Sequence, residues 1–167
     1  MFIKKTFKVA ADMKELETVT SCVRKILDEI EAPSGDSMKV EVIVEEIFSN
    51  IALYAYKDIK PDVSKSVEDK GGLAGLIDKF KSGPVSPYAK ITVTVPDDKG
   101  SITVEFQDEG TPYNPLEKPD PDITASVEDR PIGGLGIYMS KQMMDDIEYK
   151  HDGKHNILKF KKIFRQK

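Results

Sequence analysis

Three short segments of this chain carry residue types that can together bind a nucleotide. The first holds Glu46 and Asn50, the second begins at Asp108, and the third is the glycine-rich run 133–136. An amide oxygen can ligate Mg²⁺, a carboxylate can act as a general base, and backbone N–H groups at a helix start bind phosphates. In this order, the segments predict an ATP site.

Glu46 and Asn50 lie on a predicted helix from about Ser37 to Tyr56. At about 100° per residue they fall one turn apart along one edge of its apolar stripe, whereas Glu45 points toward solvent. The helical wheel therefore selects Glu46 as the candidate base and Asn50 as the candidate metal ligand. A helix with a polar border is the other interpretation of this pair. The stripe consists of Val40, Ile43, Val44, Ile47, Phe48, Ile51 and Ala55.

Asp108 follows an alternating strand and precedes residues that turn the chain. Gly110 and Pro112 favour a turn directly after the strand, which holds the Asp108 carboxylate at one point. There it can accept a hydrogen bond from an exocyclic amine such as that of adenine. A polar turn that ends a strand is the alternative. Tyr113 either flanks the base or packs beneath the loop that follows.

Gly133, Gly134 and Gly136 mark the start of a predicted helix from about Leu135 to Met144. Without side chains, they let phosphates approach the backbone N–H groups at the helix start. A helix terminus contributes only about 0.3–1 kcal/mol to anion binding, whereas micromolar affinity needs about 8 kcal/mol. Backbone hydrogen bonds, Mg²⁺ and burial of the base must supply the rest if this run binds phosphate. An ordinary flexible loop is the alternative.

The elements that position these residues are predicted from periodicity and turn signals. A further helix follows the N-cap Asp12, and two hairpins turn at 97–100 and at Asp152-Gly153. The order β-α-α-β-β-α-β-β predicts an α+β fold, a two-layer α/β sandwich with helices on one face of a mixed, mostly antiparallel sheet. The strands are expected at 2–9, 90–95, 101–107, 147–151 and 156–164.

A polar segment at about 57–88 interrupts this plan and is expected to be an insertion within one domain spanning 1–167. Its Leu73, Leu76, Ile77 and Phe80 have helical spacing. This spacing predicts a short helix that docks by its apolar face.

The composition excludes several classes of protein. A net charge of -4 argues against a nucleic-acid-binding surface, which is usually basic. No apolar run approaches the roughly 18 residues that span a bilayer, and residues 1–9 lack the apolar core of a signal peptide. The single cysteine, Cys22, fits a reducing compartment. We therefore expect a cytoplasmic protein without direct contact to membrane or nucleic acid.

The three segments resemble the GHKL (histidine kinase-like) ATPase superfamily, and within it the anti-sigma-factor serine/threonine protein kinase branch. The motifs of that branch are E-x-x-x-N-x-x-x-H-A-Y, D-x-G-x-P-F-D-P and G-G-x-G-L, and residues 153–158 resemble its closing G-x-N-x-L. The matching residues are Glu46, Asn50, Ala55, Tyr56, Asp108, Gly110, Pro112, Tyr113, Asn114, Pro115, Gly133, Gly134, Gly136 and Asp145.

The resemblance implies a Bergerat-type ATP-binding fold with ATP and Mg²⁺ as cofactors. Glu46 would be the catalytic base, Asn50 the Mg²⁺ ligand and Asp108 the adenine reader. Residues 116–132 would form an ATP lid, in which Arg130 either reaches the γ-phosphate or is solvated. The cofactor-binding residues implied are Asn50, Asp108, Gly110, Tyr113, Arg130, Gly133, Gly134, Leu135 and Gly136.

By the same resemblance, the protein would bind a sigma factor and phosphorylate a small anti-anti-sigma (STAS-type) protein. A homodimer is expected by analogy with the branch. The alternative is a nucleotide-gated binding module without kinase activity. Two departures from the branch bear on this choice. Tyr54 stands where the branch has histidine and falls within the apolar stripe, and the segment 57–88 is longer than the branch usually carries.

Overall fold

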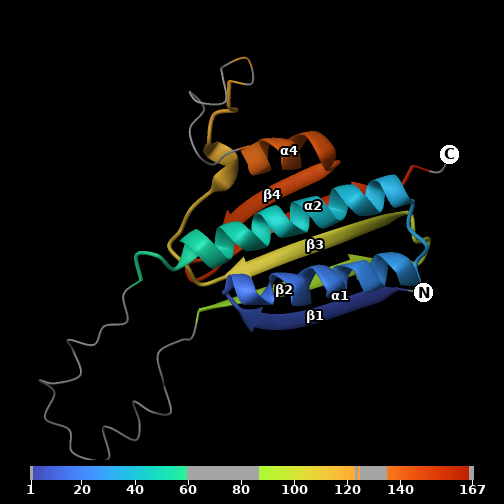
Figure 1. Cartoon of the computed structure of the whole chain (residues 1–167), viewed down its shortest axis with the longest axis horizontal. Coiled ribbons are helices and arrows are strands. Elements are labelled where there is room, and N and C mark those ends of the chain that lie inside the picture. The colour runs from blue at the N-terminus through green and yellow to red at the C-terminus, as the bar shows by residue number, and fades with distance from the viewer. Residues whose placement is uncertain (1, 60–86, 123, 125–134, 166–167) are drawn as a thin grey trace, which may run out of the picture.

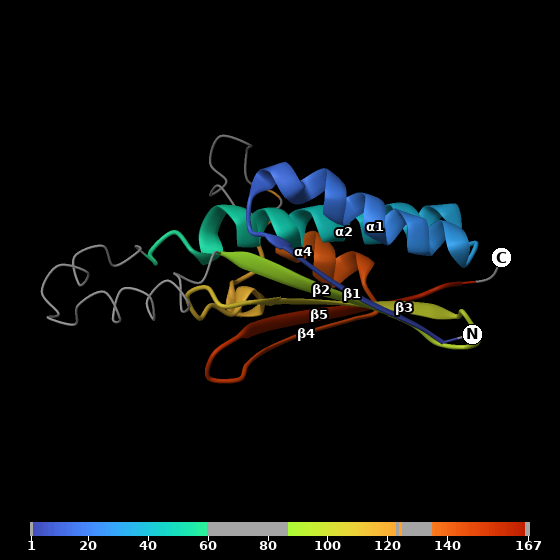
Figure 2. The ribbon, with the colours of Figure 1, turned by 90° about the horizontal axis from the view of Figure 1, so that it is seen from below.

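The structure, a computed structural model, describes residues 2–59, 87–122, 124 and 135–165. These residues form two layers, a five-stranded sheet and a layer of three α-helices. Figure 1 shows the helices lying along the sheet, and the second view places all three on the same face (Figure 2). The predicted α+β, two-layer class is therefore confirmed.

The sheet has the order β1-β2-β3-β5-β4, and each of its described pairings is antiparallel. The two predicted hairpins are present as β2–β3 and β4–β5. In the β3–β5 register, Asp108 lies opposite Asn156 at the end of the sheet. The strands are β1 (Ile3–Ala10), β2 (Tyr88–Val95), β3 (Ser101–Asp108), β4 (Asp146–His151) and β5 (Asn156–Ile163).

The helices are α1 (Leu16–Glu29), α2 (Ser34–Asn50) and α4 (Leu135–Met143), with short 3-10 turns η1 (Met13–Glu15) and η4 (Pro115–Glu117). Asp12 acts as an N-cap, but of η1, the 3-10 turn that leads into α1: its carboxylate accepts a hydrogen bond from the Lys14 N–H at 2.9 Å. Helix α2 ends earlier than expected. Its last predicted turn is a π-helical turn, η2 (Ile51–Ala55).

The core lies between the two layers. Period-2 strands and 3.6-period helices each present one apolar face, and these faces bury each other. The α2 stripe is buried as predicted except at Ala55, which is half-buried. The largest fully buried side chains include Phe48, Phe106, Phe160, Ile43, Ile47 and Ile91.

The predicted insertion falls largely on 60–86, and the helix expected around Leu73 lies outside the described residues. The chain that follows it is joined to the residue after β1, since the Ala11 N–H donates to the Pro87 carbonyl at 2.9 Å. The domain boundaries stay a prediction. Among the helices in the described ranges, none is both long and apolar enough to cross a membrane.

Candidate functional site

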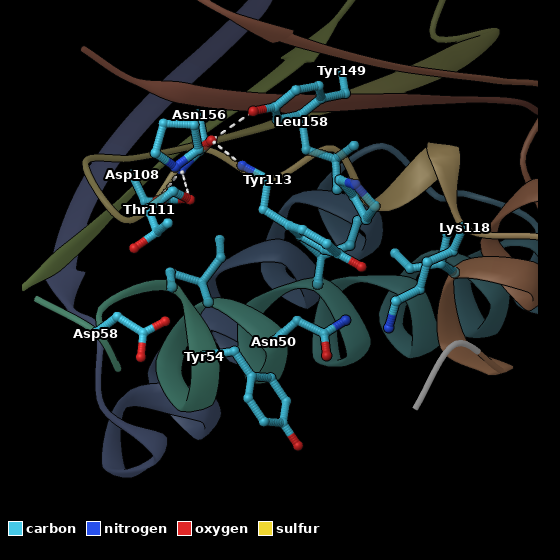
Figure 3. A pocket seen from close by; sticks show the side chains of 16 residues that line it. Asn50, Tyr54, Asp58, Asp108, Thr111, Tyr113, Lys118, Tyr149, Asn156 and Leu158 are labelled. Carbon is cyan, nitrogen blue, oxygen red and sulfur yellow. Dashed lines mark hydrogen bonds between the residues drawn. The ribbon is translucent and has the colours of Figure 1, made fainter. Parts of the chain in front are cut away.

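A cavity of about 460 Å³ opens between the end of α2, the turn after β3 and the start of α4. This volume falls in the range of about 300–1,000 Å³ typical of small-ligand sites. One wall comes from α2 and η2 and the opposite wall from the segment after β3 (Figure 3). Ile137 of α4 also lines the cavity. The first wall consists of Ile47, Asn50, Ile51, Tyr54 and Ala55, followed by Asp58.

Asp108 lines this cavity with one carboxylate oxygen fixed and the other available. The side chain is 5% exposed, and Oδ1 accepts hydrogen bonds from the Gly110 N–H at 2.8 Å and the Asn156 amide at 2.9 Å. Oδ2 accepts none from a described residue. Every fully buried side-chain oxygen of the described residues has a hydrogen-bond partner. Because Oδ2 has none, it is not fully buried and is open to the cavity that Asp108 lines. Burial raises the pKa of Asp108, and the bonds from Asn156 and Gly110 oppose that rise.

Asn156 holds this end of the cavity together. Beyond Asp108, its amide nitrogen donates to the carbonyls of Gly110 at 3.2 Å and Thr111 at 3.1 Å. Its side-chain oxygen accepts from the Tyr149 hydroxyl at 2.6 Å and the Tyr113 N–H at 3.3 Å. Sequence analysis matched the motif around Asn156 but assigned it no role. The missing signal was the β3–β5 register, which the sequence alone does not show.

The turn after β3 packs directly on the end of η2, and this contact explains Gly110. A Cβ at Gly110 would lie 2.7 Å from the Ala55 carbonyl carbon, so only glycine fits. The Thr111 N–H donates to the Ala55 carbonyl at 2.8 Å. Gly110 itself does not line the cavity. In this structure it shapes the turn that carries Asp108 and Tyr113.

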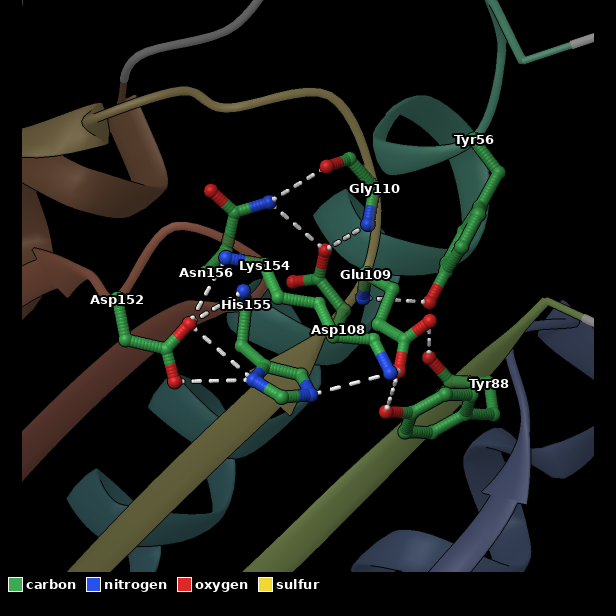
Figure 4. A network of polar contacts seen from close by, with 9 residues as sticks. All are labelled: Tyr56, Tyr88, Asp108, Glu109, Gly110, Asp152, Lys154, His155 and Asn156. Atoms are coloured by element: carbon green, nitrogen blue, oxygen red, sulfur yellow. Dashed lines mark hydrogen bonds and ion pairs between the residues drawn. The ribbon is translucent and has the colours of Figure 1, made fainter. Parts of the chain in front are cut away.

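A second polar network supports the same turn from the other side (Figure 4). The Tyr56 hydroxyl donates to the Tyr88 carbonyl at 2.6 Å and accepts from the Glu109 N–H at 2.9 Å. The Glu109 carboxylate accepts from the Tyr88 hydroxyl at 2.8 Å and lies 3.2 Å from the Lys154 ammonium and 3.3 Å from the His155 ring. Burial, with Glu109 as the hydrogen-bond partner, raises the pKa of Tyr88 to about 12.

The structure places Glu46 and Asn50 as the helical wheel predicts. Glu45 is exposed, whereas Glu46 is half-buried and Asn50 lines the cavity. Glu46 is not among the lining residues. Its carboxylate lies against Gly136 in the first turn of α4, where a Cβ would come within 2.7 Å of the Glu46 Cδ.

Two tyrosines, Tyr113 and Tyr54, line the cavity, and the sequence predicted different positions for them. Tyr113 lines it and is 52% exposed, which leaves both of its predicted positions open. Tyr54 falls within the predicted apolar stripe, but its side chain does not pack there, because Tyr54 is 57% exposed and lines the cavity. The physical reason is the π-helical turn at 51–55, which takes the residues after Asn50 off the α-helical spacing.

The phosphate end of the predicted site is described only in part. Leu135 begins α4 and is exposed, without lining the cavity. Arg130, Gly133 and Gly134 lie outside the described residues. Among those described, no group of three His, Cys, Asp or Glu side chains is placed to hold a metal ion. A Mg²⁺ ion at Asn50 would therefore need oxygens from a bound phosphate, which is how Mg²⁺ is usually held.

The comparison with known families agrees with this geometry. The family described as a histidine kinase-like ATPase domain matches residues 9–162. The chain belongs to this family.

Relatives point to one branch of the family. The serine-protein kinase RsbW of Bacillus cereus (strain AH820) and that of Bacillus thuringiensis (strain Al Hakam) are each 23% identical over 165 residues. In both cases the match covers 99% of this chain and 88% of the relative. The resemblance to the anti-sigma-factor kinase branch is thereby confirmed.

Two solved structures share the fold. The RsbU and RsbW domains of a Mycobacterium tuberculosis protein match with a TM-score of 0.60 and 13% identity, covering 99% of this chain and 33% of that one. This chain thus spans about a third of that protein's length. The SiaB-SiaC complex of Pseudomonas aeruginosa matches with a TM-score of 0.52 and 14% identity, covering 96% of this chain and 89% of that one.

Proposed function

We propose that the protein binds Mg-ATP in this cavity and transfers the γ-phosphoryl group to a serine or threonine of a partner protein. The observation that carries the proposal is the Asp108 carboxylate, which presents one free oxygen at the end of a nucleotide-sized cavity while its other oxygen is fixed by Asn156 and Gly110. Family membership supports ATP as the ligand.

Recognition of the base would rest on Asp108. Its free oxygen accepts the hydrogen bond of an exocyclic amine, and burial strengthens such a bond because water competes less. The two bonds to Oδ1 prevent the carboxylate from turning away. Tyr113, exposed at the same cavity, offers a ring face against which a base can pack.

Transfer would be carried out by residues of α2 and by backbone groups at the start of α4. Asn50 would ligate Mg²⁺, which when bound neutralises charge on the phosphates. Glu46, one turn away, would accept the proton of the attacking hydroxyl. Arg130, Gly133, Gly134, Leu135 and Gly136 are proposed to surround the phosphates.

We propose an anti-anti-sigma protein of the STAS type as the acceptor and a sigma factor as the regulated partner, in the cytoplasm and with the protein as a homodimer. The relatives named serine-protein kinase RsbW support an acceptor that carries a serine.

One observation favours a second candidate function, a nucleotide-gated binding module that transfers no phosphate. Glu46 does not line the cavity and lies against Gly136 instead. In this alternative, ATP binding would change the surface around the cavity, and partners would be released without becoming phosphorylated.

A phosphorylation assay separates the two functions. The full chain is incubated with Mg-ATP and a STAS-type protein encoded beside it, and the acceptor is examined by mass spectrometry. A phosphoserine or phosphothreonine that disappears with Glu46→Gln supports the kinase, and a loss of about 10²–10⁴-fold is expected for removal of a general base. Glu45→Gln, on the exposed side of the same helix, is the matched control.

The nucleotide step can be checked separately by thermal unfolding. Mg-ATP at about 100 times its Kd adds about 2.7 kcal/mol to the free energy of unfolding, which raises Tm by roughly 5–10 °C for a chain of this length. A rise in Tm without phosphate transfer would favour the binding module. The absence of any rise would contradict both functions.

A further inference from the structure

The cavity has an acidic end and a basic end. Among the described residues that line it, the carboxylates are Asp58 and Asp108, and the cationic side chain is Lys118. In Figure 3, Asp58 and Asp108 lie toward one end of the lining residues and Lys118 toward the other, with Asn50 between them. A ligand with an amine-bearing base and an anionic tail matches this arrangement in one direction only.

Among the described residues, none pairs with the charge of Lys118. It forms no ion pair with any residue in the described ranges, whereas Lys141 of α4 is paired with Asp120 at 3.0 Å. The Lys118 ammonium instead lies 5.8 Å from the centroid of the Tyr113 ring, a cation–π arrangement that leaves its hydrogen-bond donors free. Since Tyr113 and Lys118 both line the cavity, this contact lies at the cavity, where the exposed amine can reach a ligand.

The backbone that carries Lys118 is anchored on both sides. Before it, the Asn114 side chain caps η4 by accepting from the Leu116 N–H at 3.0 Å, and Leu116 packs against the core. After it, the Asp120–Lys141 ion pair ties the segment to α4. Lys118 is therefore held between η4 and a segment that is tied to the last turn of α4.

We propose that Lys118 binds the phosphates of the nucleotide and that the Tyr113 ring holds its amine in position for this contact. This inference rests on the proposed function and adds the residue by which the cavity distinguishes a nucleoside phosphate from the bare nucleoside. Lys118 lies outside the matched motifs, and for that reason sequence analysis did not select it.

The test compares ligands that differ only in their phosphates. Isothermal titration measures the Kd of ATP, ADP and adenosine for the full chain and for Lys118→Gln, Lys118→Arg and Lys4→Gln. The last variant removes one charge from an exposed lysine of β1 that does not line the cavity. Lys118→Gln should weaken ATP about tenfold, the size of one lost charged hydrogen bond. Adenosine should change less than twofold, and Lys118→Arg should restore most of the ATP affinity.

Two further readouts distinguish a phosphate contact from a structural role. The difference between the full chain and Lys118→Gln should shrink as salt rises, because an exposed charge is screened. Tyr113→Phe, which keeps the ring, should bind ATP like the full chain, whereas Tyr113→Leu should lose selectivity for ATP over adenosine.

The outcomes separate this inference from the proposed function. If the full chain binds ATP and Lys118→Gln binds it equally well, or loses adenosine to the same extent, the role of Lys118 is overturned and the proposed function stands. If the full chain binds no ATP at all, both are overturned.

Discussion

The Asn156 amide donates to the Asp108 carboxylate at 2.9 Å across the β3–β5 pairing, and both side chains are buried. The same amide group makes four further hydrogen bonds, two to the turn carbonyls and one each with Tyr149 and Tyr113. The position of the proposed adenine reader is thus set by a residue on another hairpin.

Asn156→Ala should lower both stability and nucleotide affinity. The substitution removes five hydrogen bonds: the Asp108 carboxylate keeps only the bond from the Gly110 N–H, and the carbonyls of Gly110 and Thr111 lose this donor. We expect a loss of about 2–4 kcal/mol in the free energy of unfolding, measured by urea denaturation, together with weaker ATP binding. Asn114→Ala, which removes the half-buried η4 cap, is the control and should cost about 1 kcal/mol. An Asn156→Ala protein as stable as this control would contradict the role assigned to Asn156.

Asp108→Asn should change how stability depends on pH. Burial raises the pKa of Asp108 above 3.8 in the folded protein, so the folded state binds this proton more tightly than the unfolded chain does. Its contribution to stability is fully present below pH 3.8 and is lost as pH rises through the raised pKa. Relative to Asp108→Asn, the free energy of unfolding of the natural chain should therefore fall as pH rises from 3.8 through the raised pKa of Asp108. Urea denaturation of both proteins from pH 3 to pH 7 measures the difference in their free energies of unfolding. A difference that does not change with pH would contradict the burial of Asp108.

Three glycine-to-alanine variants should behave differently because their surroundings differ. Gly110→Ala places a Cβ against the backbone of Ala55, which cannot move aside, and should cost about 2–4 kcal/mol. Gly136→Ala meets only the end of the flexible Glu46 side chain, so it should change stability little and alter phosphate transfer instead. Gly35→Ala has open space around it in α2 and should stabilise by up to about 1 kcal/mol.

Thermal denaturation of the three variants measures these changes, and Tm should be lowest for Gly110→Ala and highest for Gly35→Ala. Equal losses at Gly110 and Gly35 would show that the turn does not pack on η2 as described.

An ion pair between the buried Lys162 and the accessible Asp145, neither of which lines the cavity, should matter for stability alone. Lys162 is 4% exposed, and its ammonium lies 2.8 Å from the Asp145 carboxylate and 3.8 Å from that of Asp36. Lys162→Met removes this partner from both carboxylates, which keep other partners, and should cost about 1–3 kcal/mol. The double variant Lys162→Met/Asp145→Asn should recover part of that loss. ATP affinity should be unchanged in any variant that still folds, and a parallel loss of affinity would contradict the separation of the two regions.

The parts of the site that the sequence predicts are local. Spacing within α2 separates Glu46 from Glu45 and puts Asn50 on the same edge, and turn residues after β3 fix where Asp108 stands. These relations involve neighbours along one element, so periodicity contains them.

The parts that the sequence does not predict depend on contacts between elements. Asn156 reaches Asp108 only through the β3–β5 register, and Lys118 reaches the cavity only because η4 is anchored to the core and to α4. Tyr54 was misplaced because a π-helical turn interrupts the pattern from which its position was inferred.

The central claim is that Asp108 reads the exocyclic amine of adenine, and a comparison of two purine nucleotides tests it most directly. GTP carries an oxygen where ATP carries that amine, and it would face the Asp108 carboxylate with a second acceptor. Isothermal titration of the full chain should give an ATP affinity at least about tenfold higher than that for GTP, and Asp108→Asn should abolish this preference. Equal affinities for ATP and GTP, or a preference that survives Asp108→Asn, would contradict the account.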